Sequence, residues 1–223
     1  MAYRKGAGAL ALAAIATFAL AGHVIAHGDV APQAVDTSGL PELGDEWLSE
    51  NPWRDPANEH WARAIEIGAS GYNSNCARCH GLGAVSGGLA PDLRYLEADE
   101  FGDEWYLERY VNGYTQGGVT KMPAFGDLLG QEAAWAIRTY VETRPDGEGD
   151  VDALRAIKTE LEGGNADLDD VRTRLEAIAA EVETSSGAPR ADSVASRTAE
   201  MLAGGVDPAK AVETLTIGLS AAQ

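Results

Sequence analysis

The only two cysteines of this 223-residue chain lie in one five-residue run, Cys76-Ala77-Arg78-Cys79-His80. A Cys-x-x-Cys-His run is the attachment motif of c-type haem, in which both sulfurs bond to the porphyrin and the adjacent imidazole binds iron. A chain with this motif has to fold around a large apolar group. We therefore predict one covalently attached haem c, held by Cys76 and Cys79, with His80 as an iron ligand.

Three other interpretations of the two cysteines fit the sequence less well. A structural zinc site needs four Cys or His ligands, and only His23, His27 and His60 remain beyond the motif. A thioredoxin-like redox pair is expected in a βαβ context, whereas residues 68–75 show no strand pattern. A simple disulfide would give His80 no role. Haem attachment is therefore favoured.

The N-terminal residues have the pattern of a secretory signal peptide. Arg4 and Lys5 precede an apolar stretch over residues 6–22, and small residues suited to cleavage follow at 24–26. The stretch relies on Ala and Gly, so it is marginal as a membrane anchor. We predict a signal peptide over 1–26, a mature chain that begins at His27, a periplasmic location in a bacterium and no stable membrane anchor after cleavage.

The mature chain is strongly acidic. Without residues 1–26 it has 15 basic and 35 acidic side chains, a net charge of about −20. Nucleic acid and anionic lipid are therefore excluded as expected partners. Such a surface is attracted to basic patches on other proteins, or serves only for solubility.

Aromatic residues divide the mature chain near residue 145. Residues 27–144 contain 13 of them, including all five Trp, and residues 145–223 contain none. The turn-rich run over 145–149 is the natural boundary. We predict an N-terminal arm over 27–58 that wraps the surface, a haem domain over 59–145 and an acidic helical extension over 146–223.

Hydrophobic spacing predicts an all-α fold. In the haem domain it indicates helices over 59–70, 103–112 and 131–143, and no convincing strand appears. In the extension, apolar residues recur every three or four positions over 151–161 and 168–182, with Asp150 and Asp207-Pro208 as helix starts and a loop over 185–189. These stripes have to bury against one another, the haem domain or another subunit, and self-packing is favoured.

The sixth iron ligand decides the function, because an iron closed by a second protein ligand passes electrons while an open iron binds small molecules. Met122 is the favoured ligand, since a thioether is a soft neutral ligand and the other methionines lie in the signal segment and the distant extension. His60 is the rival ligand. An open site is the third alternative.

These motifs together resemble class I c-type cytochromes. The likeness rests on the motif at 76–80 and on Ala90-Pro91-Asp92-Leu93, Val111-Asn112-Gly113 and Met122-Pro123-Ala124-Phe125. Residues 27–37 and 102–106 further resemble the periplasmic branch that accepts electrons from quinoprotein alcohol dehydrogenases. The resemblance implies the class I all-α fold over 59–145, a Pro91 carbonyl that accepts a hydrogen bond from His80, and Arg94 as a propionate partner.

The resemblance also implies a function. It is that of a monohaem electron carrier, not an enzyme, with a dehydrogenase holding pyrroloquinoline quinone (PQQ) as donor and a downstream cytochrome or oxidase of the respiratory chain as acceptor. Two alternatives remain at this point: a haem enzyme or ligand sensor with an exchangeable sixth ligand, and a docked cytochrome subunit of a larger dehydrogenase complex. The extension lies outside the resemblance.

Overall fold

The structure is a computed structural model, and it describes residues 32–221. The expected signal peptide and the first five residues of the expected arm lie outside the described residues. Residues 32–221 fall within one compact unit. None of the helices in this part of the chain has both the length and the apolar character that crossing a membrane requires.

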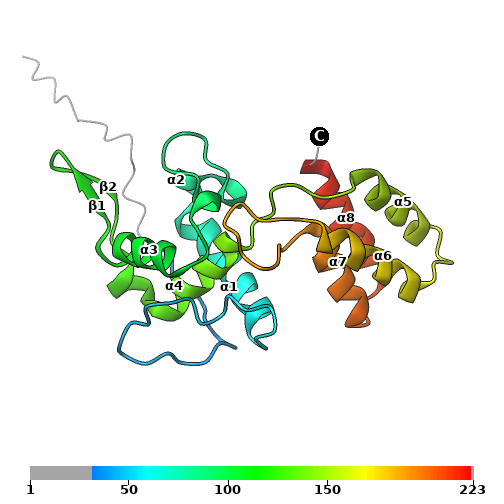
Figure 1. Ribbon diagram of the computed structural model, residues 1–223, viewed down its shortest axis with the longest axis horizontal. Coiled ribbons are helices and arrows are strands. Elements are labelled where there is room, and N and C mark those ends of the chain that lie inside the picture. The colour runs from blue at the N-terminus through cyan, green and yellow to red at the C-terminus, as the bar shows by residue number, and fades with distance from the viewer. Residues whose placement is uncertain (1–31, 222–223) are drawn as a thin grey trace, which may run out of the picture. The chain divides into compact units, whose positions relative to one another are not determined.

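The segment with the haem motif is built from four helices, two short 3-10 turns and one hairpin (Figure 1). They are α1 Trp61–Asn75, α2 Ala77–His80, η1 Leu82–Ala84, η2 Leu93–Tyr95, α3 Glu100–Asn112, β1 Tyr114–Gln116, β2 Val119–Met122 and α4 Gly126–Glu142. The three expected helices are present, with shifted ends. For example, α3 begins at Glu100 because the Asp99 carboxylate accepts a hydrogen bond from the Gly102 N–H at 2.8 Å.

Helices α1 and α4 cross in close contact, and Gly68 is what permits the close approach. A Cβ atom at Gly68 would lie 2.0 Å from the carbonyl oxygen of Ala136 in α4. Around this crossing lies a cluster of buried side chains that we call the main cluster: Trp61, Ile65, Tyr72, Ala84, Leu93, Tyr106, Tyr110, Phe125, Ala134, Ile137, Tyr140 and Val141. The all-α class I expectation is confirmed in this region.

The expectation that the haem domain contains no strand is wrong in one place. Strands β1 and β2 pair antiparallel, with Gln116 opposite Val119, and form a two-stranded sheet. Gly117 and Gly118 both have positive φ, at 59° and 76°, which suits a tight two-residue hairpin turn. The strands have three and four residues and are mostly exposed, so they leave no alternating hydrophobic pattern in the sequence.

The arm does more than wrap the surface, because Trp53 is only 1% exposed. Its ring belongs to a second buried cluster, together with Ala64 and Ile67 of α1 and Trp135 and Ala136 of α4. The described part of the arm therefore supplies a core residue to the haem domain.

Buried ion pairs fasten the same arm to α3 and α4. Arg54 lies 2.6 Å from Asp103 and 2.8 Å from Glu142, and Arg138 lies 2.8 Å and 2.9 Å from the same two carboxylates. The side chains of Arg138, Asp103 and Glu142 are at most 1% exposed. Burial raises the pKa of Glu142, although both arginines oppose the rise. The arm is thus tied to α4 by charge as well as by packing.

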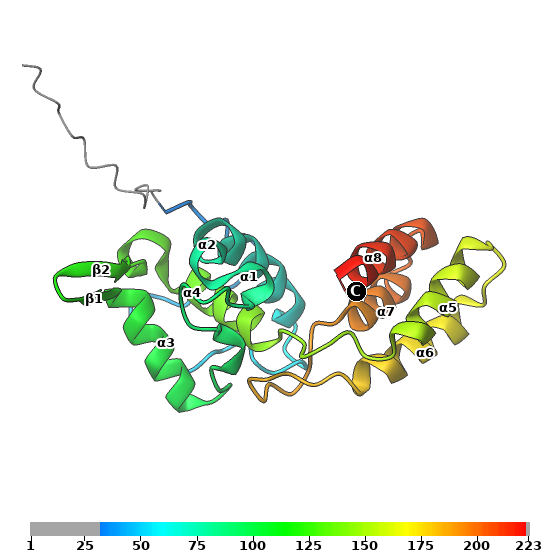
Figure 2. The same ribbon diagram turned by 90° about the horizontal axis from the view of Figure 1, so that it is seen from above.

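The extension consists of helices α5 Val151–Glu162, α6 Leu168–Ala180, α7 Val194–Ala203 and α8 Pro208–Ala221 (Figure 2). The Asp150 carboxylate caps α5 and the Asp207 carboxylate accepts from the N–H of Ala209 in α8, as expected. Helix α7 was not anticipated. The apolar stripes form a buried cluster of their own, which confirms the self-packing: Leu154, Ile157, Leu161, Val171, Leu175, Val194, Ala195, Ala199, Ala211, Leu215 and Leu219.

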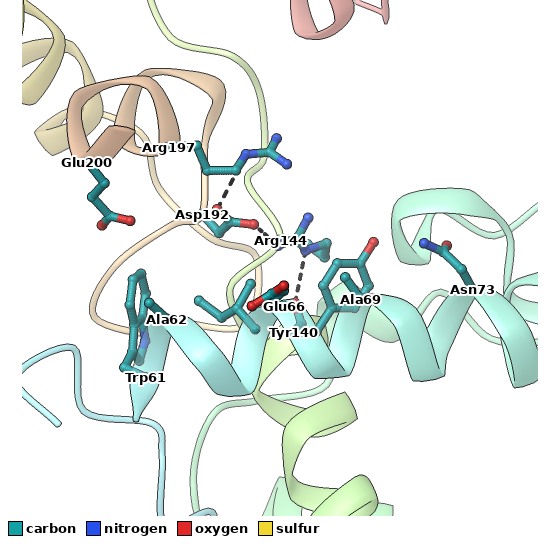
Figure 3. Close-up of a pocket in the computed structure, with 11 residues that line it drawn as sticks. Trp61, Ala62, Glu66, Ala69, Asn73, Tyr140, Arg144, Asp192, Arg197 and Glu200 are labelled. Atoms are coloured by element: carbon teal, nitrogen blue, oxygen red, sulfur yellow. Dashed lines mark hydrogen bonds and ion pairs between the residues drawn. The ribbon is translucent and has the colours of Figure 1, made fainter. Parts of the chain in front are cut away.

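Residues between α6 and α7 return to the end of α4. The Arg144 guanidinium donates to the Asp192 carboxylate at 2.5 Å, with both side chains 8% exposed, and lies 3.9 Å from the centre of the Tyr140 ring. The Ser186 hydroxyl donates to the carbonyl of Glu142 at 2.6 Å. Arg144, Asp192 and Tyr140 line a pocket beside α1 (Figure 3), and its volume is about 380 Å³. The domain boundary near residue 145 stays a prediction.

Candidate haem site

The attachment motif continues the helical path of α1. The N–H of Cys76 donates to the carbonyl of Tyr72 at 2.8 Å, and the N–H of His80 donates to the carbonyl of Cys76 at 3.0 Å. The two cysteines form no disulfide with each other; Cys76 is half-buried against the main cluster and Cys79 is exposed. Burial raises the pKa of Cys76 to about 12. The helical path sets the spacing of the two sulfurs and the imidazole.

His80 and Pro91 are brought together, although eleven residues separate them. The Nδ1 atom of His80 lies 2.9 Å from the carbonyl oxygen of Pro91. A carbonyl oxygen only accepts, so Nδ1 carries the hydrogen and Nε2 keeps the lone pair that a metal requires. The Tyr72 hydroxyl donates to the carbonyl of Gly81 at 2.8 Å and holds the start of the intervening loop. Sequence reasoning did not find this role of Tyr72.

The same loop places Arg94 against Asp92. Arg94 donates to the two carboxylate oxygens of Asp92 at 3.0 Å and 2.8 Å, and its guanidinium lies 5.6 Å from the centre of the Tyr95 ring. The hydrogen bond from Arg94 is the largest cause of the lowered pKa of Asp92. Asp92 also accepts from the N–H of Ser86 at 3.2 Å. Arg94 as a propionate partner stays a prediction, and Asp92, which orients it, was missed.

Met122 ends strand β2 and is half-buried against the main cluster, as is Cys76. Gly113 at the end of α3 has a φ of 69°, and a Cβ atom there would lie 2.5 Å from the carbonyl oxygen of Met122. On the other side, the N–H of Phe125 donates to the carbonyl of Tyr110 at 2.8 Å. The backbone of Met122 therefore lies close against the end of α3, and the hydrogen bond of Phe125 ties the segment after the methionine to the same helix.

His60 does not share this location. It precedes α1, whereas Cys76 follows the last residue of that 15-residue helix. At 1.5 Å per residue, the two positions are about 24 Å apart along the helix. Bonds from iron to imidazole nitrogen are far shorter than this distance, so His60 and His80 do not reach the same iron.

The residues around the motif fit an apolar prosthetic group. Four large apolar side chains between the motif and α3 are exposed: Leu82 at 78%, Val85 at 49%, Leu89 at 70% and Tyr95 at 66%. Such a concentration is unusual on a free protein surface and indicates a contact with a partner or ligand. Together with two cysteines that form no disulfide and an imidazole whose Nδ1 is already bonded to Pro91, these side chains suit haem c.

Comparison with known proteins gives the same answer. The family model described as "Cytochrome C oxidase, cbb3-type, subunit III" matches residues 63–141. Cytochrome c550 of Pseudomonas aeruginosa is 55% identical over 136 residues, which are 61% of this chain and 91% of that protein. The chain belongs to the c-type cytochromes.

Other relatives are larger proteins, and this cytochrome matches only a small part of each. Quinohemoprotein alcohol dehydrogenase ADH-IIG of Pseudomonas putida is 36% identical over 89 residues, 40% of this chain and 12% of that enzyme. The cbb3-type cytochrome c oxidase subunit FixP of Rhizobium meliloti is 31% identical over 93 residues, 35% of this chain and 29% of that subunit. No solved structure matches. The class I assignment is confirmed, and this cytochrome is an electron-transfer protein of a family that binds haem c.

Proposed function

We propose that this cytochrome carries one electron at a time on a single covalent haem. It would accept electrons from a PQQ-dependent alcohol dehydrogenase and pass them to a downstream cytochrome or oxidase of the respiratory chain. The observation that carries the proposal is that Cys76 and Met122 pack against the same cluster. This supports an iron closed on both sides, which is the arrangement of a carrier. No substrate bond is broken in this function, so it is not enzymatic.

Six residues of the chain would have distinct roles in holding the haem. Cys76 and Cys79 would tether the haem, and the presence of only one motif supports a count of one. His80 would bind iron through Nε2 while Pro91 fixes the imidazole through Nδ1, a contact that also strengthens the bond to iron. Met122 would supply the neutral sulfur ligand, and Arg94 would face a propionate. Bound haem supplies an iron that alternates between the ferrous and ferric states.

The donor and acceptor are proposed from the relatives. Two relatives are quinohemoprotein alcohol dehydrogenases, and the part that this chain resembles is 12% of one and 11% of the other. A similar cytochrome that is a separate protein would be suited to accept electrons from a dehydrogenase of the same kind. The likeness to FixP supports transfer toward an oxidase. The expected signal peptide over 1–26 supports a periplasmic location, without a stable membrane anchor once it is removed.

The ligands are tested on the full-length protein, matured in a host that attaches haem c. We expect a near-infrared sulfur-to-iron band in the ferric state, and we expect Met122→Ala to abolish it and to open the reduced protein to carbon monoxide. His60→Ala is the matched control and should keep the band. A wild-type protein without this band, or a Met122→Ala variant that retains it, would exclude Met122 as the ligand.

The donor is tested by stopped-flow mixing of the ferric cytochrome with an alcohol-reduced PQQ dehydrogenase. Rapid appearance of the ferrous spectrum is the expected result. If candidate dehydrogenases leave the cytochrome ferric while ascorbate reduces it, the proposed donor is wrong.

A further inference from the structure

Three aromatic side chains are exposed together on α3 and the start of β1. Phe101 is 69% exposed, and Trp105 and Tyr114 are each 40% exposed. Phe101 and Trp105 are four residues apart in one helix, so they lie on the same face. A single exposed aromatic residue needs no explanation, but a group of them is typical of a surface that another molecule covers.

Two of the three rings, those of Trp105 and Tyr114, are held in place by Arg109. Its guanidinium lies 5.3 Å from the centre of the Trp105 ring and 5.0 Å from the centre of the Tyr114 ring, and it pairs with Glu108 at 2.8 Å. These contacts are cation–π interactions that join α3 to the hairpin. Rings that are already ordered lose little conformational entropy when a partner binds. Trp, Tyr and Arg are also the residues that dominate binding energy at protein interfaces.

Carboxylates run alongside the aromatic group. Glu100, Glu104 and Glu108 are exposed and recur every four residues, so they form one acidic row on α3. Among residues 32–221, Glu100 and Glu104 have no ion-pair partner. Many acids of the extension do have one; Glu162 pairs with Lys158 at 2.6 Å, for example. The carboxylates of Glu100 and Glu104 are therefore available to an external partner. We call Phe101, Trp105, Tyr114 and the three glutamates the α3 ridge.

The negative charge of the α3 ridge determines which kind of molecule can bind to it. A second copy of this chain is disfavoured because both copies carry a large negative charge, and anionic lipid is repelled for the same reason. A complementary protein face has an apolar recess for the aromatic side chain of Phe101 and basic side chains around that recess for the glutamates of the ridge.

The ridge also lies on the helix that borders the candidate haem site. Tyr106 and Tyr110 of α3 are buried in the main cluster, which Cys76 and Met122 border. Figure 2 shows α3 leading directly into the hairpin that ends at Met122. A partner seated on the exposed face would be separated from that cluster by about one helix diameter, 10–12 Å.

We propose that the α3 ridge is the docking surface for a basic face of the electron-donating dehydrogenase, an inference that rests on the proposed function. Phe101 would enter an apolar recess of the dehydrogenase, while Glu100 and Glu104 meet lysine or arginine side chains around it. Because such encounters are brief, the carboxylates act mainly on the association rate and Phe101 acts mainly on the lifetime of the complex.

The test measures the second-order rate constant for reduction of the full-length ferric holocytochrome by an alcohol-reduced PQQ dehydrogenase, at low and high salt. We expect Phe101→Ser to lower the constant about fivefold or more at both salt concentrations. Glu104→Gln should lower it about twofold to threefold at low salt, and the effect should vanish at high salt. Glu104→Gln alters an exposed side chain only, so it keeps the test valid if Phe101→Ser reduces stability.

The matched control is Glu213→Gln with Ile217→Ser on α8, which removes one carboxylate and one apolar side chain that is 65% exposed. Its rate constant should equal that of the wild type, and ascorbate should reduce all variants equally. If, at low salt, the dehydrogenase reduces the Glu104 variant at the wild-type rate and the Phe101 variant within about twofold of it, the docking surface is wrong and the proposed function stands. If the wild type is not reduced at all, the donor proposal fails and the docking proposal fails with it.

Discussion

Replacing Gly68 with alanine tests the close approach of α1 to α4. The added Cβ would lie 2.0 Å from the Ala136 carbonyl oxygen, 2.6 Å from its carbon and 2.8 Å from the Cβ of Tyr140. Ordinary contact begins at 3.4 Å, so α1 and α4 have to separate by about 1.4 Å. Two of the three atoms belong to the backbone of a buried helix and do not move independently of it.

The expected loss of stability follows from two opposing effects. Overpacking of a core costs about 1–3 kcal/mol, and the upper end applies because the obstruction is backbone. The higher helix propensity of alanine stabilises the folded state by about 1 kcal/mol relative to glycine. We therefore expect Gly68→Ala to lower the free energy of unfolding by about 2 kcal/mol.

Gly71→Ala is the matched control in the same helix. Its Cβ would meet Ile137 and Val35 at 3.1 Å, and these atoms are the ends of side chains that shift more easily. The same gain in helix propensity offsets this smaller cost, so the net change is about zero. Urea unfolding of both ferric holoproteins, followed by far-ultraviolet circular dichroism and the Soret band, measures the difference. Equal stability of the two variants would show that α1 and α4 are not packed as closely as described.

Three further substitutions have defined outcomes. Arg144→Ala leaves the buried carboxylate of Asp192 with the longer ion pair to Arg197 at 3.5 Å and should lower the free energy of unfolding by about 2 kcal/mol in urea, whereas Arg155→Ala, in an exposed pair, should change it by less than about 0.5 kcal/mol. Tyr72→Phe removes the hydrogen bond to the Gly81 carbonyl and should cost about 1 kcal/mol in the same assay. Asp92→Asn tests pH dependence: a lowered pKa contributes stability above the ordinary value of 3.8, and the contribution disappears as pH falls through the lowered pKa. The wild type should thus be the more stable protein at neutral pH and lose that advantage in acid; an advantage that stays constant with pH would contradict this reasoning.

Helices were predictable from the sequence where one face is apolar, and this explains the agreement for α1, α3 and α4. Helix α7 was missed because its apolar positions are largely Ala, as at Ala195 and Ala199, and alanine gives a weak hydrophobic signal. The hairpin was missed because its residues are mostly exposed and show no alternating hydrophobic pattern. Gly117-Gly118 was the available signal, since paired glycines mark tight hairpin turns.

The residues of the candidate site could be predicted where they are close together in the sequence. Cys76, Cys79 and His80 form one run, so their roles are expected from spacing alone. The contact between His80 and Pro91 was expected only through resemblance, because no short-range pattern indicates which carbonyl an imidazole will meet. The roles of Asp92 and Tyr72 depend on the path of the loop between them and could not be inferred. The network of Arg138 and Asp103 was equally hidden, since its members come from distant segments.

The arm has a consequence for how this polypeptide matures. The side chain of Asn51 bonds to Thr139 and Glu142, which lie 88 and 91 residues further along the chain. Closing so long a loop is slow, and it has to wait until α4 has left the ribosome. Throughout that interval the indole of Trp53 has no interior to enter, so the arm reaches its native position only after α4 has been synthesised.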